Sequence, residues 1–395
     1  MSEGLLILGG DIVWQGKLQK NKGLLMRGGK IIRFGVSNGK NLTCLRLQDE
    51  LIIPGLIDIH THGAGGVDVS KGSIIKFAKF KASEGATACI PTLSLPVDEL
   101  PQRFKEIKEE LSAVEELDFP QIIGFRIEGP FLRHAGGIDK EVLSKGINQE
   151  VIDKILNASN NQIRILDISP ELPGAIDVIE NLSKRGIICS IAHTRATIEQ
   201  TKKAVDSGAR LVTHFYDTFI VSEPPLPGVY PTSLVDYLLI EDRVSVEIIP
   251  DKVHVSSILV EKAFRCKGVQ RIIFVTDSNP AAGLPRGRYR LQDSTLGGEI
   301  EIFDRNSGVY RAGTKELVGS ALMPIDCFRN AITLFKRSIE DASQVCSKNP
   351  ADLLGLNKGE LALGRDADIV ILDRDSLKVR YTIVAGKVIF SRENF

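Results

Sequence analysis

The sequence predicts an α/β fold, a (β/α)8 TIM-type barrel with a small β-sandwich domain built from both chain termini. Eight apolar, β-branched runs recur from Leu51 to Thr276, and segments with helical spacing of apolar residues separate them. Strand-like segments without helical periodicity occupy both ends of the chain. Eight strand–helix units over roughly 300 residues match a closed parallel barrel. A doubly wound open sheet is the structural rival, but no GxGxxG motif follows the first strand.

The terminal segments are expected to be short strands joined by turns. They are Leu5–Leu8, Gly23–Arg27 and Lys30–Phe34 near the amino end, and Asp368–Asp373 and Val379–Ile389 near the carboxyl end. Strands at both ends of a different middle indicate one small β domain assembled from the two ends. We therefore expect a sandwich from residues 1–53 and 356–395 around a barrel from residues 54–355.

The middle of the chain alternates between apolar runs and helical segments. The expected barrel strands are Leu51–Ile59, Ala86–Ile90, Ile122–Ile127, Ile163–Ile168, Ile187–Ala192, Arg210–Thr213, Val244–Ile249 and Arg271–Thr276. The clearest helical segments are Ser73–Ser83, Val97–Glu116, Gly174–Arg185, Thr197–Ser207 and Ser256–Cys266.

Composition excludes several classes of partner. Lys plus Arg equals Asp plus Glu at 50 each, which gives no electrostatic reason to expect nucleic acid or an anionic membrane. The six cysteines are scattered without a CxxC pair and indicate a reducing compartment. No apolar stretch approaches the ~18 residues of a membrane span. We expect a cytoplasmic protein.

Chemically active side chains follow the predicted strands. His60 and His62 end the first strand, where their i, i+2 spacing places both imidazoles on one side. Five more residues follow later strands: Glu128, His193, His214, His254 and Asp277. Taken alone, each of these residues is explained equally well by a structural role, as a buried imidazole or a paired carboxylate. Because the carboxyl ends of all eight strands meet at one barrel mouth, we expect them to form a single site.

Imidazole and carboxylate are ligand types that zinc, iron and manganese accept. We predict one metal held by Glu128, His193 and His214, and a second held by the histidine pair of the first strand with Glu128 as a bridge. A bound metal would lower the pKa of water to about 7. Asp277 would take the proton from that water and pass it to the leaving amine. Metal-assisted hydrolysis of an amide-type bond is the predicted reaction class.

Motifs along most of the chain support this prediction. They are Pro-Gly-Leu-Ile-Asp-Ile-His-Thr-His-Gly at 54–63, Glu-Gly-Pro-Phe at 128–131, Ala-His-Thr at 192–194, Thr-His at 213–214, Asp-x-x-His-Val at 251–255, Thr-Asp at 276–277 followed by Pro-Ala-Ala-Gly at 280–283, Val-Gly-Ser-Ala-Leu at 318–322, Asn-Pro-Ala at 349–351 and Gly-Arg-Asp-Ala-Asp-Ile-Val at 364–370. Together they resemble the amidohydrolase superfamily, and specifically its N-acetylglucosamine-6-phosphate deacetylase family.

The resemblance implies removal of an N-acetyl group from an amino sugar phosphate by a homodimer. It implies one or two divalent metals per chain, with zinc preferred over iron, manganese, cobalt or nickel. It assigns Asp277 as the catalytic residue. The substrate-binding residues that it implies are His254, Asp217, Thr218, Asp139, Leu317, Val318 and Gly319.

Two stretches near the expected metal site depart from the family pattern. Arg126-Ile127 precedes Glu128, where the family usually has His-Leu. The family then carries a Lys-Gly-x-His element, whereas residues 135–139 of this chain contain no histidine.

The expected phosphate-binding segment also departs. Residues 216–219 are Tyr-Asp-Thr-Phe in place of the family's Phe/Tyr-Asn-Ala-Met, and no Arg or Lys occurs in residues 211–242, where the family has a phosphate-binding arginine. A phosphate needs a cation or several donors. Arg286 and Arg288 could replace that arginine, although solvated loop charges are the commoner reading of such residues.

Two other functions stay open. The first is hydrolysis of a different N-acyl or cyclic amide substrate, which need not be phosphorylated. Many cyclic-amide hydrolases use a carboxylated lysine as the bridging ligand, so Glu128 argues against those. The second is a non-catalytic sugar-binding regulator, which would have no need for a ligand set together with Asp277.

Overall fold

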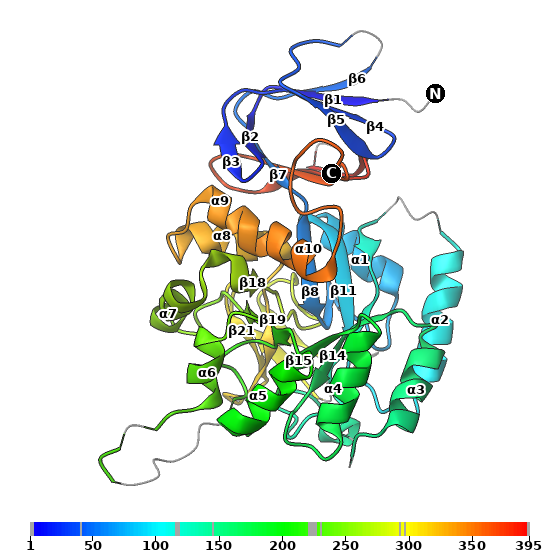
Figure 1. The fold of residues 1–395 in the computed structure, drawn as a ribbon. Helices are drawn as coiled ribbons and strands as arrows, with labels where there is room; N and C mark the ends of the chain where they lie inside the picture. The colour runs from blue at the N-terminus through cyan, green and yellow to red at the C-terminus, as the bar shows by residue number, and fades with distance from the viewer. Residues whose placement is uncertain are drawn as a thin grey trace.

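The computed structural model describes residues 4–39, 42–114, 119–143, 146–219, 227–229, 231–291, 294–295 and 298–392. A barrel forms the larger part, and a smaller β domain lies against one end of it, with the first and last described residues of the chain in that smaller domain (Figure 1). None of the helices in these ranges is long and apolar enough to cross a membrane.

The barrel sheet confirms the predicted fold class. Its strands follow the order β8–β11–β13–β14–β15–β16–β17–β18, and every neighbouring pair is parallel. A parallel bridge between Thr61 and Ser278 brings the first strand against the chain that follows the last. The bounds are Leu56–Thr61 (β8), Ala86–Leu93 (β11), Phe125–Ile127 (β13), Ile163–Ile168 (β14), Ile188–Ile191 (β15), Leu211–Val212 (β16), Ser245–Ile248 (β17) and Ile272–Phe274 (β18), with Gln121–Ile122 (β12) pairing beside β11.

Helices cover the outside of this barrel, as Figure 1 shows. Their apolar faces are buried against the strands, which is why the spacing of apolar residues could be recognised in the sequence. The bounds are Ile74–Ala82 (α1), Leu100–Ser112 (α2), Gln149–Ala158 (α3), Ala175–Lys184 (α4), Ile198–Asp206 (α5), Leu234–Ile240 (α6), Ser257–Lys267 (α7), Pro324–Thr333 (α8), Ile339–Ser343 (α9) and Asn349–Leu354 (α10), with short 3₁₀ or π turns at Lys140–Val142, Val269–Arg271 and Gln344–Lys348.

The smaller domain consists of two sheets around its own apolar core. One sheet has the order β5–β4–β1–β6, and the other has the order β25–β24–β23–β7–β2–β3, so the second combines both ends of the chain. The bounds are Leu5–Leu8 (β1), Asp11–Trp14 (β2), Lys17–Gln19 (β3), Leu24–Arg27 (β4), Lys30–Phe34 (β5), Thr43–Arg46 (β6), Leu51–Pro54 (β7), Ile369–Leu372 (β23), Val379–Val384 (β24) and Lys387–Ser391 (β25).

The prediction of one strand at Leu51–Ile59 is wrong, because the run changes sheets at Gly55. Strand β7 pairs with β2 and β23 of the smaller domain, whereas β8 pairs with β11 of the barrel. A Cβ atom at Gly55 would lie 2.1 Å from the Thr87 hydroxyl oxygen, so only glycine fits at the crossing. We propose that the chain divides into the two predicted domains, and that the boundary between them lies where the chain passes from β7 to β8.

An antiparallel sheet follows the last barrel strand and was not predicted. It runs β19–β20–β21–β22, with bounds Gly287–Tyr289, Ile300–Ile302, Gly308–Arg311 and Leu317–Ser320. The backbone N–H of Ser320 donates to the Asp277 carbonyl at 2.9 Å. This sheet therefore places its last strand directly beside the barrel mouth. Two-residue strands at Gly63–Ala64 (β9) and Val67–Asp68 (β10) form a small hairpin after β8.

Candidate metal centre and active site

The predicted site residues lie at the carboxyl ends of the barrel strands. His60 is in β8, and Glu128 follows β13 directly. His193, His214 and Asp277 lie just beyond β15, β16 and β18, and their φ angles are 43°, 24° and 43°. Positive φ is uncommon for residues other than glycine and costs conformational energy, so it concentrates at functional sites. The strands thus end in turns that aim these three side chains at one point.

Three donor atoms form a compact triangle. Glu128 Oε1 lies 3.2 Å from both His193 Nε2 and His214 Nε2, and the two imidazole nitrogens are also 3.2 Å apart. A tetrahedral zinc ion with bonds of about 2.0 Å holds its ligands about 3.3 Å from one another. All three side chains are buried. The triangle therefore fits a divalent metal ion.

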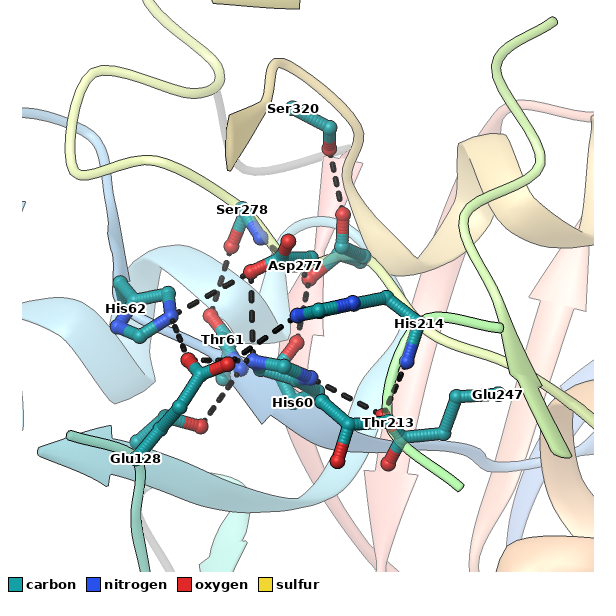
Figure 2. Close-up of polar contacts among 12 residues, drawn as sticks. His60, Thr61, His62, Glu128, Thr213, His214, Glu247, Asp277, Ser278 and Ser320 are labelled. Carbon is teal, nitrogen blue, oxygen red and sulfur yellow. Dashed lines mark hydrogen bonds and ion pairs between the residues drawn. The ribbon is translucent and has the colours of Figure 1, made fainter. Parts of the chain in front are cut away.

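The second oxygen of Glu128 faces another set of donors. Glu128 Oε2 lies 3.1 Å from His60 Nε2 and 2.8 Å from His62 Nε2. Asp277 Oδ1 approaches the same two nitrogens at 3.3 and 3.4 Å (Figure 2). Because each carboxylate oxygen of Glu128 serves a different set, this residue can bridge two metal ions.

The carboxylates among these donor residues favour positive charge at the site. Burial disfavours the imidazolium form of His62, but hydrogen bonds to Asp277 and Glu128 raise the pKa of His62 to about 10. Burial also opposes ionisation of Glu128, yet the neighbouring histidines hold the pKa of Glu128 well below its usual range. Without a metal, His62 therefore favours its protonated form, so metal binding at this residue has to release a proton. Metal affinity should therefore fall as the pH falls.

The outer nitrogens of two histidines are held by acceptors. His193 Nδ1 lies 3.0 Å from the backbone carbonyl of His134, and His60 Nδ1 lies 3.1 Å from Glu247 Oε2. Metal-ligating histidines commonly donate the other ring N–H in this way, which leaves Nε2 free to bind. His134 had no predicted role, and its carbonyl supplies one. The Nδ1 atom of His214 has no hydrogen-bond partner among the described residues.

A cavity of about 210 Å³ lies over the candidate metal centre. Its walls contain Glu128, His193, His214, His62 and Asp277, while His60 is buried beneath it. All predicted substrate-binding residues line the same cavity: His254, Asp217, Thr218, Asp139, Leu317, Val318 and Gly319. The structure thus brings the whole predicted site together, and the roles of these residues stay predictions.

His254 is fixed by a neighbouring carboxylate. Its Nδ1 lies 2.6 Å from Asp251 Oδ2. Burial disfavours the charged imidazole, but the hydrogen bond and the charge of Asp251 raise the pKa of His254 above its ordinary value. The remaining nitrogen, Nε2, is therefore a good hydrogen-bond donor to a substrate oxygen.

Arg286 and Arg288 do not line this cavity. Arg288 Nε lies 3.3 Å from Glu301 in the added sheet, and Arg286 borders a separate hollow with Pro285 and Asp304. The residues that line the main cavity within the described part of the chain include no lysine or arginine. The hypothesis that these two arginines replace the missing phosphate ligand therefore has no support from their positions.

Sequence reasoning missed a group of buried charges beneath the site. Arg126, Asp167 and Glu247 come from β13, β14 and β17 and contact one another inside the barrel. Lys81 of α1 is also buried and donates to Asp58 at 2.8 Å. For Arg126, Asp167 and Glu247 the only signal was a charged residue within an apolar predicted strand, and Lys81 of the helix gave no such signal.

Comparison with known proteins agrees with the geometry. The model of the amidohydrolase family matches residues 51–389. The chain belongs to the amidohydrolase family. This amidohydrolase is 31% identical to the N-acetylglucosamine-6-phosphate deacetylase of Lysinibacillus sphaericus, over 92% of each chain. It is 29% identical to the N-acetylgalactosamine-6-phosphate deacetylase of Escherichia coli O157:H7, over 86% of this chain and 88% of that protein.

A solved structure extends the similarity to the complete fold. The N-acetyl-D-glucosamine-6-phosphate deacetylase of Mycobacterium smegmatis superposes with a TM-score of 0.85 at 26% identity, over 98% of this chain and all of that one. A mutant of that enzyme, with the same TM-score, is in complex with N-acetyl-D-glucosamine-6-phosphate. This amidohydrolase is therefore a hydrolase of the metal-dependent type, with a barrel and a smaller β domain like those of its relatives.

Proposed function

We propose that this amidohydrolase removes the N-acetyl group from an amino sugar, with N-acetylglucosamine 6-phosphate as the first substrate to test. The observation that carries the proposal is the pair of donor sets that meet on Glu128, with Asp277 Oδ1 3.3 Å from His60 Nε2. Relatives that cover most of the chain are named as deacetylases of amino sugar phosphates, which supports the same reaction.

Each part of the reaction has a candidate residue in the chain. Glu128, His193 and His214 would hold one divalent cation, with zinc preferred, and His60 and His62 would help to hold a second. When bound, such a cation supplies Lewis acidity, which activates water and polarises a carbonyl oxygen. The Asp277 carboxylate would accept the proton from water and deliver it to the amine nitrogen as the amide bond breaks.

The substrate would lie in the cavity above this centre. His254 Nε2 would donate to an oxygen of the acetamide or sugar, because Nδ1 is already occupied by Asp251. Thr218 and the Leu317–Gly319 segment would surround the sugar ring. We further propose a cytoplasmic homodimer, which rests on the scattered cysteines and on the family resemblance.

A second candidate substrate is an unphosphorylated N-acyl amino sugar. Asp139, Asp217 and Glu316 line the cavity and are not among the donors around Glu128, and no lysine or arginine is among its described lining residues. A phosphate dianion beside three carboxylates is repelled unless cations or several hydrogen-bond donors offset the charge. Hydroxyl or amine groups would be favoured there instead.

An acetate-release assay separates the two candidates. Metal-loaded protein would be incubated with N-acetylglucosamine 6-phosphate, N-acetylgalactosamine 6-phosphate and the two unphosphorylated sugars. Turnover of at least one of them is expected, and its loss after chelation with recovery on adding zinc would establish metal dependence. A higher kcat/KM for the unphosphorylated sugars supports the second candidate. Full activity of a metal-free preparation, or no turnover of any N-acyl sugar, contradicts the proposal.

A further inference from the structure

The buried charges under the metal centre form one connected cluster. Arg126 donates from Nε and Nη2 to the two oxygens of Asp167 at 2.7 and 2.8 Å. It donates from Nη1 and Nη2 to the two oxygens of Glu247 at 2.5 and 3.2 Å. Arg126 and Glu247 are 0% exposed and Asp167 is 1% exposed. The cluster therefore lies inside the barrel, out of reach of a substrate.

Glu247 connects this cluster to a predicted metal ligand. Glu247 Oε2 lies 3.1 Å from His60 Nδ1 and 3.3 Å from the backbone nitrogen of His214. In Figure 2, Glu247 and Glu128 lie on opposite sides of the His60 ring. An ionised carboxylate only accepts hydrogen bonds, so His60 must carry its proton on Nδ1. The lone pair of Nε2 then faces Glu128 and Asp277, where a metal ion would bind.

Arg126 keeps the Glu247 carboxylate in the ionised form that accepts a hydrogen bond from His60. Both oxygens of Glu247 face the guanidinium of Arg126, which has donors and no acceptor. A protonated carboxyl or an amide at position 247 would place one of its own hydrogens against an N–H of Arg126 or of His60. The geometry therefore admits an ionised carboxylate and disfavours its neutral analogues.

Stability alone does not account for such a cluster. Replacing a complete buried ion cluster with apolar residues of similar volume is often neutral or stabilising, so buried charges are weak evidence of a stabilising role. Glu247 is also poorly placed to be a metal ligand itself, because Arg126 occupies its oxygens and the His60 ring separates it from Glu128. A contact that fixes the ring and tautomer of His60 is the remaining role.

We propose that Glu247, held by Arg126 and Asp167, is a positioning residue that orients His60 and thereby commits this site to a second divalent cation. The inference rests on the proposed metal-dependent function and goes beyond it, because it assigns the second cation to residues that never touch the substrate. Outer-sphere partners of this kind typically change metal affinity by about 10- to 100-fold.

The test removes the charges first, so that no variant leaves an isolated buried ion. The background carries Arg126→Met and Asp167→Asn. One variant adds Glu247→Gln, which keeps an oxygen to accept from His60 Nδ1 once the guanidinium is gone. The matched variant adds Glu247→Leu, which has similar volume and no acceptor. The two differ only in the contact to His60.

Metal content per chain and stepwise zinc affinity would be measured by elemental analysis and by titration against a chelating dye. Wild type is expected to bind two zinc ions. The Gln variant should retain both within several-fold in affinity, and the Leu variant should keep the first and bind the second about 10- to 100-fold more weakly. Equal second-site affinity in the Gln and Leu variants overturns the inference.

A control pair reports on general damage to the fold. Lys358 and Asp368 form another buried ion pair, at 2.6 Å, that contacts no metal ligand. Lys358→Met with Asp368→Asn should leave both zinc affinities unchanged. If the triple variants do not fold, Glu247→Gln alone supplies the measurement, and unaltered second-site affinity there overturns the inference.

The outcomes also separate this inference from the proposed function. Wild type that binds one zinc ion and turns over an N-acyl sugar would overturn the role of Glu247 and leave the deacetylase proposal intact. Wild type that binds no metal would overturn both.

Discussion

Replacement of Asp277 by asparagine tests the proton carrier directly. The backbone of this residue is held on both sides, because its N–H donates to the His60 carbonyl and its carbonyl accepts from Ser320, each at 2.9 Å. Its φ of 43° suits asparagine as well as aspartate. The asparagine side chain would therefore occupy the same place, and an amide oxygen could remain beside His60 and His62.

The expected loss follows from the missing proton acceptor. An amide cannot accept a proton from water at neutral pH, and a positioned general base contributes about 10²- to 10⁴-fold in rate. This corresponds to about 3–5 kcal/mol in activation free energy. The metal content of Asp277→Asn should match wild type, since both candidate donor sets on Glu128, the one with His193 and His214 and the one with His60 and His62, are unchanged.

Steady-state acetate release and elemental analysis would be performed on the same preparations. Glu301→Gln is the matched control, because it removes a carboxylate that pairs with Arg288 outside the cavity. Its rate should stay near wild type. If Asp277→Asn keeps more than about a tenth of the wild-type kcat, Asp277 is not the proton carrier. If it loses metal along with activity, the residue acts as a ligand instead.

Two further predictions concern hydrogen bonds around the site. Asp251→Asn should lower the pKa of His254, because the carboxylate that stabilises the charged imidazole is lost. The pH at which KM begins to rise should therefore shift downward. A KM profile that does not move contradicts the role of His254 as a charged donor. Lys81→Met should reduce the free energy of unfolding by about 3–5 kcal/mol, since it leaves the buried Asp58 carboxylate without its cation, and adding Asp58→Asn should restore much of that loss in denaturant unfolding.

The sequence was sufficient to predict the barrel and the position of its mouth. Apolar β-branched runs predicted the strands because a parallel strand is buried on both faces, and polar residues just beyond those runs predicted the mouth. The run at Leu51–Ile59 was misjudged because it stays apolar while passing from one sheet to another. Nothing in its hydrophobicity marks Gly55 as the crossing, since that depends on the close approach of Thr87.

The buried charges could not be predicted from spacing. Arg126, Asp167 and Glu247 are separated by 41 and 80 residues; β13 and β14 are paired neighbours, and the curvature of the barrel brings β17 across to them. Lys81 occurs in an amphipathic helix, where a lysine is normally expected to face solvent. Its burial against Asp58 is a tertiary contact between a helix and the first barrel strand. The candidate metal donors could be proposed from the sequence because they lie at strand ends, which the sequence locates by itself.

The same contrast explains why the reaction is easier to infer than the substrate. The metal donors come from the strand ends of the barrel, whose positions follow from the fold. The cavity walls come from loops and from the added sheet, so the pattern of barrel strands does not determine Asp139, Asp217 or Glu316. These residues lie outside the donor sets on Glu128. Replacing one of these carboxylates with a cation therefore changes the electrostatic potential at a bound substrate, while the geometry of the metal donors stays intact. Asp139→Lys or Asp217→Lys should accordingly raise kcat/KM for a phosphorylated sugar relative to its unphosphorylated form without changing metal content.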